Sequence, residues 1–323
     1  MKKNNLVLNL VIPCYNEEEA LPLTKKELDK KMSSLIEEGL ISENSKVVLV
    51  NDGSKDKTWE IITKIHKENH MYVGINLTRN RGHQNALLAG LMYAKNHADI
   101  CISMDADLQD DINVMDDMIK KYNAGADVVY GVRSSRKKDT FFKKFTAEAF
   151  YKLMNIMGVE VVFNHADCRL MSKRALEGLS EFKEVNLFLR GIVPQVGYKT
   201  DIAYYERSER VAGESKYPLK KMLAFAIDGI TSFSIKPLRM ITSIGFIILI
   251  LSFVVLIYSI IMKLIGNTVS GWTFIVCSIW LIGGIQTLCL GVIGEYIGKI
   301  YSETKSRPRY IISENLNEKD NKN

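Results

Sequence analysis

The chain has 323 residues, 47% of them hydrophobic and 25% charged, and a formal net charge of +6. This length holds one large or two small domains, and the apolar content supplies a core. Much of the positive excess lies beside two long uncharged stretches in the last third, which favours anionic lipid or phosphate as a partner and argues against nucleic acid. The five cysteines show no CxxC pairing, so we expect unpaired thiols in a reducing compartment.

The first 133 residues alternate short apolar runs with charged, amphipathic segments. The N-terminal run is too short for a signal peptide and contains Asn9, so it is interpreted as a first strand of a cytosolic domain. Strand–helix units of this length predict an α/β fold with a doubly wound parallel sheet and right-handed crossovers. Strands are predicted over 6–12, 46–50, 71–77, the run from 100 and 127–131, with helices over 22–38, 58–69, 83–96 and 112–123.

Polar side chains follow each predicted strand at its C-terminal end. They include Asp52 after the second strand, Arg79 and Arg81 after the third, Asp105 after the fourth and Arg133 after the fifth. In open α/β sheets ligands bind at this edge, so these side chains should meet at one site. Carboxylates for a base and a metal, with guanidiniums for phosphate oxygens, suit a nucleoside diphosphate. The alternative is that each cluster is separate turn chemistry.

The stretch ICISMDADLQDD carries the most specific of these clusters. Asp105, Asp107 and Gln109 offer two carboxylates and an amide oxygen, which suit a hard divalent cation such as Mg²⁺ or Mn²⁺ and leave positions open for a diphosphate. Taken alone, the DxD pattern has only three letters and fits equally well with loop and N-cap residues of the next helix.

Together these motifs carry a resemblance. VIPCYNEE, VNDGS, DADLQ, the GVR that ends at Arg133 and the later HADCRLMS resemble glycosyltransferase family 2 with the GT-A fold. Within that family the chain is similar to polyprenyl-phosphate glycosyltransferases, of the bactoprenol glucosyltransferase and dolichol-phosphate mannose synthase kind. The likeness covers nearly the whole chain, and the ordered set is far more specific than any one motif.

The resemblance implies a metal-dependent enzyme whose partners are a UDP-sugar, a polyprenyl phosphate and membrane lipid. It implies that Pro13, Tyr15 and Glu17 line a uridine site and that Asp52 hydrogen-bonds the base. Arg79 is expected to bind the nucleotide at its phosphates.

The resemblance also implies where the chemistry occurs. Asp105 would lie near the ribose as well as the metal, and Asp107 would act in catalysis as a metal ligand. Asp167 matches the aspartate of the family's DFR signature and is followed by Arg169, the other expected catalytic residue. Cys168 replaces the usual Phe of that signature, which changes local packing but leaves the chemistry intact.

Two basic segments are expected to act at phosphates and the membrane surface. Residues 133–144 combine lysines with phenylalanines and lead into an amphipathic helix predicted over 146–157, which favours a membrane-surface element over a solvated loop. Residues 206–221 form a flexible basic loop that resembles the family loop closing on the donor diphosphate and acceptor phosphate. The expected phosphate ligands are Arg133, Arg207, Arg210, Ser215 and Lys216.

The last third predicts attachment to a membrane. Two uncharged stretches, 240–262 and 272–294, would each be about 34 Å long as helices, enough to span a hydrocarbon core of roughly 30 Å. Flanking lysines and arginines place both termini in the cytosol of a multi-pass plasma-membrane protein. The predicted parts are a cytosolic GT-A domain over 1–218, an interfacial helix over 219–237, two spans within 238–298 and a cytosolic tail over 299–323 that is disordered after Arg309.

The resemblance implies inverting transfer of a sugar, glucose or N-acetylglucosamine, from UDP to undecaprenyl phosphate. A phosphate ester's second pKa is about 6, so the acceptor is already largely ionised and Asp167 is expected to orient a substrate or to act as a base. The alternatives are a processive synthase, disfavoured because no QxxRW motif is present, a transferase for a soluble hydroxyl acceptor, and a non-catalytic nucleotide-sugar binding protein.

The product would serve cell-envelope glycan modification, with a flippase and a membrane glycosyltransferase expected downstream. Glycines in the second span would allow close packing against another helix, so a homo-oligomer is one of the expected states.

Overall fold

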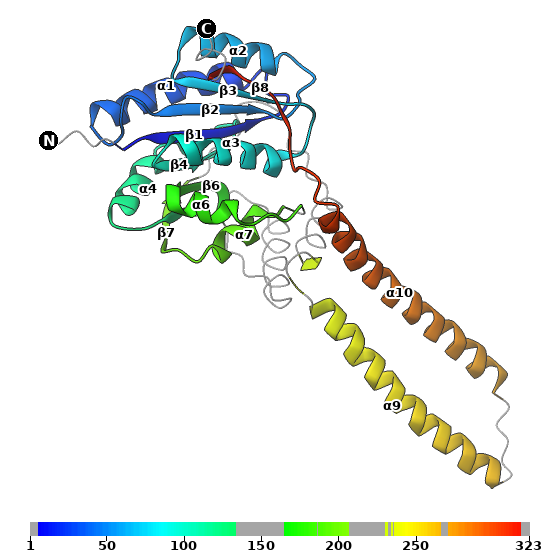
Figure 1. Cartoon of the computed structure of the whole chain (residues 1–323). Coiled ribbons are helices and arrows are strands. Elements are labelled where there is room, and N and C mark those ends of the chain that lie inside the picture. The colour runs from blue at the N-terminus through cyan, green and yellow to red at the C-terminus, as the bar shows by residue number, and fades with distance from the viewer. Residues whose placement is uncertain are drawn as a thin grey trace. The chain divides into compact units, whose positions relative to one another are not determined.

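The computed structural model describes residues 6–133, 165–185, 187–206, 230–231, 234, 236–265 and 271–317. These residues form two compact units. The first consists of the described residues up to 206 and from 307 onward, and the second of those between 230 and 306. The first unit holds a β-sheet with helices, and the second holds a pair of long helices (Figure 1).

The sheet of the first unit is mixed. Its strands are β1 (Leu8–Cys14), β2 (Lys46–Asn51), β3 (Tyr72–Leu77), β4 (Ile100–Ser103), β5 (Val128–Arg133), β6 (His165–Ser172), β7 (Thr200–Tyr205) and β8 (Ile312–Asn315). They lie in the order β7-β5-β6-β4-β1-β2-β3-β8. Strand β6 runs antiparallel to both β4 and β5, and β8 runs antiparallel to β3, whereas the other neighbours are parallel.

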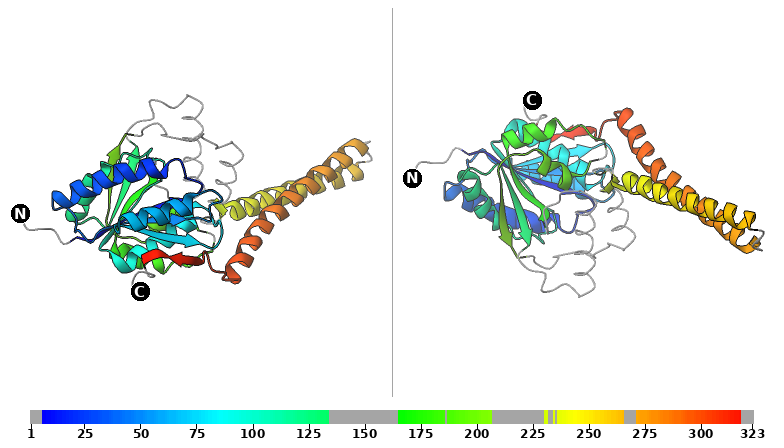
Figure 2. Two further views of the ribbon diagram at one scale, coloured as in Figure 1. Left: turned by 90° about the horizontal axis from the view of Figure 1, so that it is seen from above. Right: turned by 90° about the horizontal axis from the view of Figure 1, so that it is seen from below.

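Helices cover both faces of the sheet (Figure 2). They are α1 (Leu21–Glu37), α2 (Thr58–Glu68), α3 (His83–His97), α4 (Val114–Asn123), α6 (Lys173–Ser180) and α7 (Leu189–Gln195). Because side chains alternate along a strand, β1 serves both layers: Leu10 and Ile12 join the core cluster with α1, α2 and α4, whereas Val11 faces α3. A Cβ at Gly90 of α3 would lie 2.3 Å from Cγ1 of Val11, so glycine lets this helix pack close to the sheet.

The predicted strands and helices of the first 133 residues are confirmed, with small shifts at their ends. Strand β1 extends through Pro13 and Cys14, which were predicted to lie in the following loop, because these residues pair with Val50 and Asn51 of β2. The five strands predicted in the first 133 residues all run in one direction, as predicted, but β6 and β8 run antiparallel to their neighbours and make the sheet mixed. An apolar strand pattern gives no direction, and both strands take theirs from partners that are distant in sequence.

The prediction of a disordered tail after Arg309 is wrong for the segment that contains β8. The carbonyl of Ile311 accepts a hydrogen bond from the N–H of Thr78 at 3.0 Å. Leu316 is 7% exposed, and a Cβ at Gly74 of β3 would lie 2.6 Å from its Cδ1 atom. The polar composition of the tail predicts disorder, but a short strand forms there because it pairs with the edge of β3.

The second unit consists of α9 (Lys236–Leu264) and α10 (Trp272–Thr304), which run side by side in Figures 1 and 2. Large apolar side chains are exposed along both helices, among them Phe246, Val254, Leu281 and Leu288. The two predicted spans are therefore helical, but their insertion in a membrane stays a prediction. Within the part of the chain that the structure describes, Leu281–Thr304 is the one helical stretch with the length and composition of a membrane span. The predicted segments over 134–157 and 219–229 lie outside the described residues.

Replacing Leu316 with alanine is expected to lower the free energy of unfolding by about 2 kcal/mol or more, because it leaves a cavity where β8 meets the core. Chemical denaturation of the purified full chain in detergent measures this. Ile311, 47% exposed, is the matched control, and its alanine variant should stay within about 0.5 kcal/mol of the wild type. Equal effects of the two substitutions would contradict the packing of β8.

Candidate active site

Hydrogen bonds join the loop after β1 to the loop after β2. The N–H of Asn16 donates to Oγ of Ser54 at 3.0 Å, and the N–H of Glu17 donates to Oγ1 of Thr58 at 2.9 Å. Both loops line one hollow, to which Glu17 contributes. Tyr15, two residues before Glu17, is 42% exposed. The two loops predicted to bind the nucleoside therefore lie side by side.

The loop after β2 also packs against the loop after β3. Gly53 has a φ of +60°, and a Cβ there would lie 2.4 Å from the backbone nitrogen of Asn80, so glycine allows this close approach. Asp52 is 2% exposed, and its Oδ1 accepts a hydrogen bond from the N–H of Arg81 at 2.7 Å. Burial raises the pKa of Asp52, and the N–H groups of Arg81 and Gly82 oppose that rise. The carboxylate holds the turn that leads into α3.

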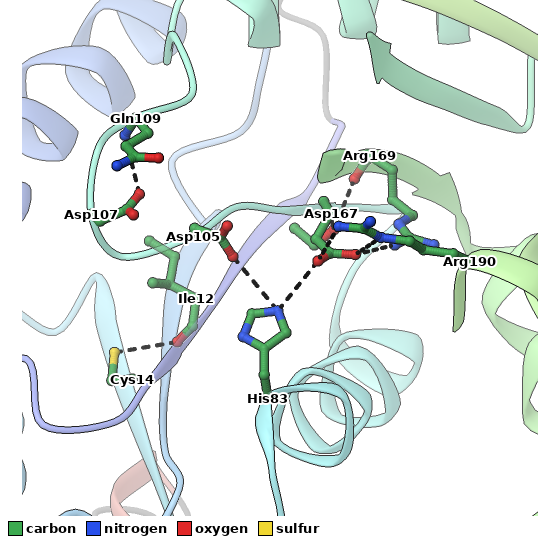
Figure 3. Close-up of polar contacts among 10 residues, drawn as sticks. Ile12, Cys14, His83, Asp105, Asp107, Gln109, Asp167, Arg169 and Arg190 are labelled. Atoms are coloured by element: carbon green, nitrogen blue, oxygen red, sulfur yellow. Dashed lines mark hydrogen bonds and ion pairs between the residues drawn. The ribbon is translucent and has the colours of Figure 1, made fainter. Parts of the chain in front are cut away.

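The loop after β4 curls back on itself (Figure 3). Leu108 has a φ of 52°, which is rare for a residue with a side chain, and Oδ1 of Asp107 accepts a hydrogen bond from the N–H of Gln109 at 3.2 Å. The hydroxyl of Tyr205, at the end of β7, donates to Oδ1 of Asp110 at 2.5 Å. These contacts hold Asp107 and Gln109 next to each other.

The register of β4 against β6 places Asp105 near Asp167. Ser103 pairs with Arg169 in antiparallel strands, so the residues after Ser103 lie beside those before Arg169. His83, the first residue of α3, lies between the two carboxylates (Figure 3). Its Nε2 is 3.6 Å from Oδ1 of Asp105 and 3.8 Å from Oδ2 of Asp167. Two strands and a helix thus bring three ionisable groups together.

Negative charge accumulates around Asp105. Desolvation is the main reason that its pKa is raised to about 6, and the carboxylates of Asp167, Asp110 and Asp107 add to the rise. His83 acts in the opposite direction without cancelling it. A cation bound at this place would relieve the repulsion.

The residues present fit a divalent metal ion that is shared with a diphosphate. Within the described ranges, no three His, Cys, Asp or Glu side chains are grouped to hold a metal ion by themselves. Asp105 and Asp107 with the amide oxygen of Gln109 supply hard oxygen donors, and Mg²⁺ commonly takes one or two carboxylates and completes its shell with water and substrate phosphates. Desolvation and then the neighbouring carboxylates raise the pKa of Asp105, and a bound cation would offset both by favouring the ionised carboxylate.

Two arginines bind the carboxylate of Asp167. Arg190 forms a fork, with Nε 3.1 Å from Oδ1 and Nη2 3.0 Å from Oδ2 (Figure 3). Nη2 of Arg169 donates to Oδ1 at 3.0 Å. Burial alone would raise the pKa of Asp167, but Arg190 and then Arg169 outweigh it and hold that pKa well below its usual range. Asp167 is therefore ionised at neutral pH.

Arg169 and Arg190 differ in their surroundings. Arg169 is 1% exposed, and its Nη1 also donates to the carbonyl of Leu189 at 3.4 Å. The N–H of Leu189 in turn donates to Oε1 of Gln84 in α3 at 2.8 Å. Arg169, which was expected to be catalytic, lies below the surface and positions Asp167 and α7. Arg190, which follows Leu189 in α7, has a side chain that is 29% exposed.

The predicted site residues divide into three groups. Asp52, Asp105 and Asp107 lie at the edge where β1 to β4 end, as predicted. Gln109 and Asp167 lie beside them, with Pro13 buried in β1 and Arg79 exposed after β3. Arg133 ends β5, and nothing further is described for its side chain. The proposed phosphate ligands of the 206–221 loop lie outside the described residues; they are Arg207, Arg210, Ser215 and Lys216.

Two residues at the site were missed from the sequence, His83 and Arg190. His83 directly follows the TRNRG cluster, and that position was the available signal. Arg190 is a lone charge in the apolar run LFLRGIV, 23 residues after Asp167. Such a charge in an otherwise buried run needs a partner, but the sequence does not say which one.

Comparisons with known proteins identify relatives of this chain. The sequence profile described as glycosyl transferase family 2 matches residues 9–180, which include the loops after β1 to β4 and Asp167. The uncharacterized glycosyltransferase YkoT of Bacillus subtilis (strain 168) is 53% identical over 98% of this chain and 94% of that protein. The prophage bactoprenol glucosyl transferase homolog of Escherichia coli (strain K12) and the bactoprenol glucosyl transferase of Shigella phage SfX are each 43% identical, over 94% of this chain and 98% of those proteins.

Replacing Asp105 with asparagine is expected to raise the melting temperature of the metal-free protein at pH 7.5. Asp105 ionises at about pH 6 in the folded protein and at about pH 3.9 in an unfolded chain, so the folded state binds more protons between these values. Its contribution to stability therefore falls as the pH rises from about 4 to about 6. Thermal unfolding in EDTA at pH 7.5 and at pH 4 measures the effect.

The gain from Asp105→Asn should shrink toward pH 4, where the wild-type carboxyl is protonated in the folded state and the repulsion is lost. Asp117 is an exposed carboxylate of α4 paired with Lys121, and Asp117→Asn serves as the control without such a gain. A gain from Asp105→Asn that is equally large at both pH values would contradict the charge repulsion described for Asp105.

Proposed function

The chain belongs to glycosyl transferase family 2, and from this membership we propose that it transfers one sugar from a UDP-sugar to a polyprenyl phosphate, undecaprenyl (bactoprenyl) phosphate first among them. It is a glycosyltransferase with a GT-A-like α/β fold and a mixed sheet. The observation that carries the proposal is the meeting of Asp105, Asp107 and the Asp167–Arg190 pair at one sheet edge.

The names of the relatives support the choice of substrates. Two proteins that are 43% identical over most of the chain are named for bactoprenol and glucosyl transfer. We therefore infer bactoprenyl phosphate as the acceptor and glucose as the first donor sugar to test, with N-acetylglucosamine next. The product would be a lipid-linked sugar phosphate for modification of cell-envelope glycans.

The UDP moiety is proposed to lie across the loops after β1, β2 and β3. Tyr15 and Glu17 stand at or beside the hollow between the first two loops and suit contacts to uridine. Asp52, which holds the turn at Arg81, is the proposed acceptor for the N–H of the base. Arg79 is exposed after β3 and is the proposed partner of the diphosphate.

In this reaction an acceptor phosphate oxygen forms a bond to the anomeric carbon while the bond from that carbon to the UDP oxygen breaks. The acceptor oxygen is already ionised for the most part at neutral pH, so no proton has to be removed. Asp167 is poorly suited as a base in any case, because Arg190 and Arg169 keep it ionised and its pKa low. Direct attack from the face opposite to UDP inverts the anomeric configuration.

Asp105, Asp107 and Gln109 are the residues proposed to hold Mg²⁺ or Mn²⁺. When bound, such an ion supplies positive charge to the leaving diphosphate. The two carboxylates lie on the loop after β4, and the hydrogen bond from Gln109 to Asp107 gives that loop a fixed shape before any ligand binds. A preformed donor set lowers the cost of ordering the loop on binding.

We place the transfer at the cytosolic face of the plasma membrane. The exposed apolar side chains of α9 and α10 suit a lipid environment, and basic residues flank this helix pair in the sequence. A hairpin with both ends in the cytosol keeps the sheet domain on the side where UDP-sugars are found. The basic segments at 133–144 and 206–221 remain proposed contacts for lipid and phosphate.

Replacing Asp107 with alanine is expected to lower the rate of UDP release by about 100-fold or more, because a metal ligand next to the leaving group is lost. The assay uses the purified full chain in detergent with Mn²⁺, undecaprenyl phosphate and a panel of UDP-sugars. Asp117→Ala, on the exposed face of α4, should leave the rate unchanged. UDP release that needs neither metal nor lipid phosphate, or that survives Asp107→Ala, would overturn the proposed function.

A further inference from the structure

Arg190 stands out among the charged residues at the site. It is the more exposed of the two guanidiniums that bind Asp167, with 29% of its side chain accessible against 1% for Arg169. It lies on α7, in a stretch that carries none of the motifs that mark the nucleotide site. The roles assigned so far to the loops after β1 to β4 leave this residue unexplained.

The position of Arg190 is fixed from three sides. Its Nε and Nη2 lie 3.1 Å and 3.0 Å from the two oxygens of Asp167 on β6. The preceding residue, Leu189, is bound through its N–H to Gln84 of α3 and through its carbonyl to the buried Arg169. A planar group held in this way has already lost most of its rotamer freedom, so it can bind a second oxyanion at a low entropic cost.

An anionic acceptor needs such a cation at this place. Asp105, Asp107 and Asp167 gather at the edge where the sugar would be transferred, and a lipid phosphate carries about 1.5 to 2 negative charges near neutral pH. A metal ion at Asp105 and Asp107 would serve the donor diphosphate. An acceptor phosphate on the β6 side would meet the carboxylate of Asp167, and two like charges at close range repel unless a cation lies between them.

We propose that Arg190 binds the acceptor phosphate, and that Asp167 holds the guanidinium in the orientation that this contact requires. The inference rests on the proposed function and names a residue for its acceptor subsite. Arg169 cannot take this role because it is buried below Asp167. Asp167 then acts as a positioning residue for Arg190, and its ionised state is what the arrangement needs.

The chain provides its own control for this pair. Arg174 forks the carboxylate of Asp127, which precedes β5 and also accepts a hydrogen bond from Ser172 at the end of β6. This second pair lies at the end of β6 opposite to Asp167. Removing Arg174 therefore breaks an arginine–aspartate fork of the same kind away from the site.

The test compares Arg190→Gln, Arg190→Lys and Arg174→Gln in steady-state kinetics of the full chain, with undecaprenyl phosphate and the UDP-sugar varied separately. Arg190→Gln is expected to raise KM for the lipid phosphate about 10- to 100-fold and to leave KM for the UDP-sugar within about twofold. Arg190→Lys, which keeps the charge but loses the fork, should fall between these values. Arg174→Gln should leave both KM values within about twofold.

An unchanged KM for the lipid phosphate in Arg190→Gln, with a lower kcat or a higher KM for the UDP-sugar, would overturn the inference and make Arg190 a support of the donor site. If Arg190→Gln does not fold, as judged by its melting temperature, Arg190→Lys is used instead. A rise in its KM for the lipid phosphate without a matching rise in its KM for the UDP-sugar then supports the inference, and the absence of such a rise overturns it. The proposed function fails separately, when the wild-type chain shows no turnover that depends on lipid phosphate.

Discussion

The antiparallel register between β4 and β6 is the constraint on which the site depends. Pairing of Ser103 with Arg169 carries Asp105 and Asp167 to the same edge of the sheet, where their charges repel. The two carboxylates differ in how far nearby cations offset this repulsion. On β6, two arginines keep Asp167 ionised, whereas in the loop after β4 the pKa of Asp105 stays raised. A metal-bound diphosphate beside β4 and an anionic acceptor beside β6 fit this asymmetry.

Most of the sheet edge could be predicted because its signals are local. Each strand ends in polar residues that follow an apolar run, and parallel strands bring such ends together. The turns after β2 and β3 are an example, since the glycine of NDGS is where the two loops approach closely. The motif around Asp167 was recognisable too, although its strand direction was not.

The missed features depend on contacts between distant segments. Arg190 is positioned by Asp167 on β6 and, through the preceding Leu189, by Gln84 on α3. No local sequence pattern predicts these partners. Strand β8 escaped prediction for the same reason, because its stability comes from the edge of β3 and the burial of Leu316. The chain thus returns from the second unit to the sheet beside the strand that leads to Arg79 and Arg81.

The central claim is that the phosphate of a polyprenyl lipid is the nucleophile, which explains why an aspartate held ionised by arginines can stand where a base would be expected. Phosphorus-31 NMR of the full chain turning over UDP-glucose and undecaprenyl phosphate tests this most directly. The account predicts that the lipid monophosphate signal is replaced by that of a phosphodiester in step with the appearance of UDP. Release of UDP with the lipid monophosphate signal unchanged would contradict it.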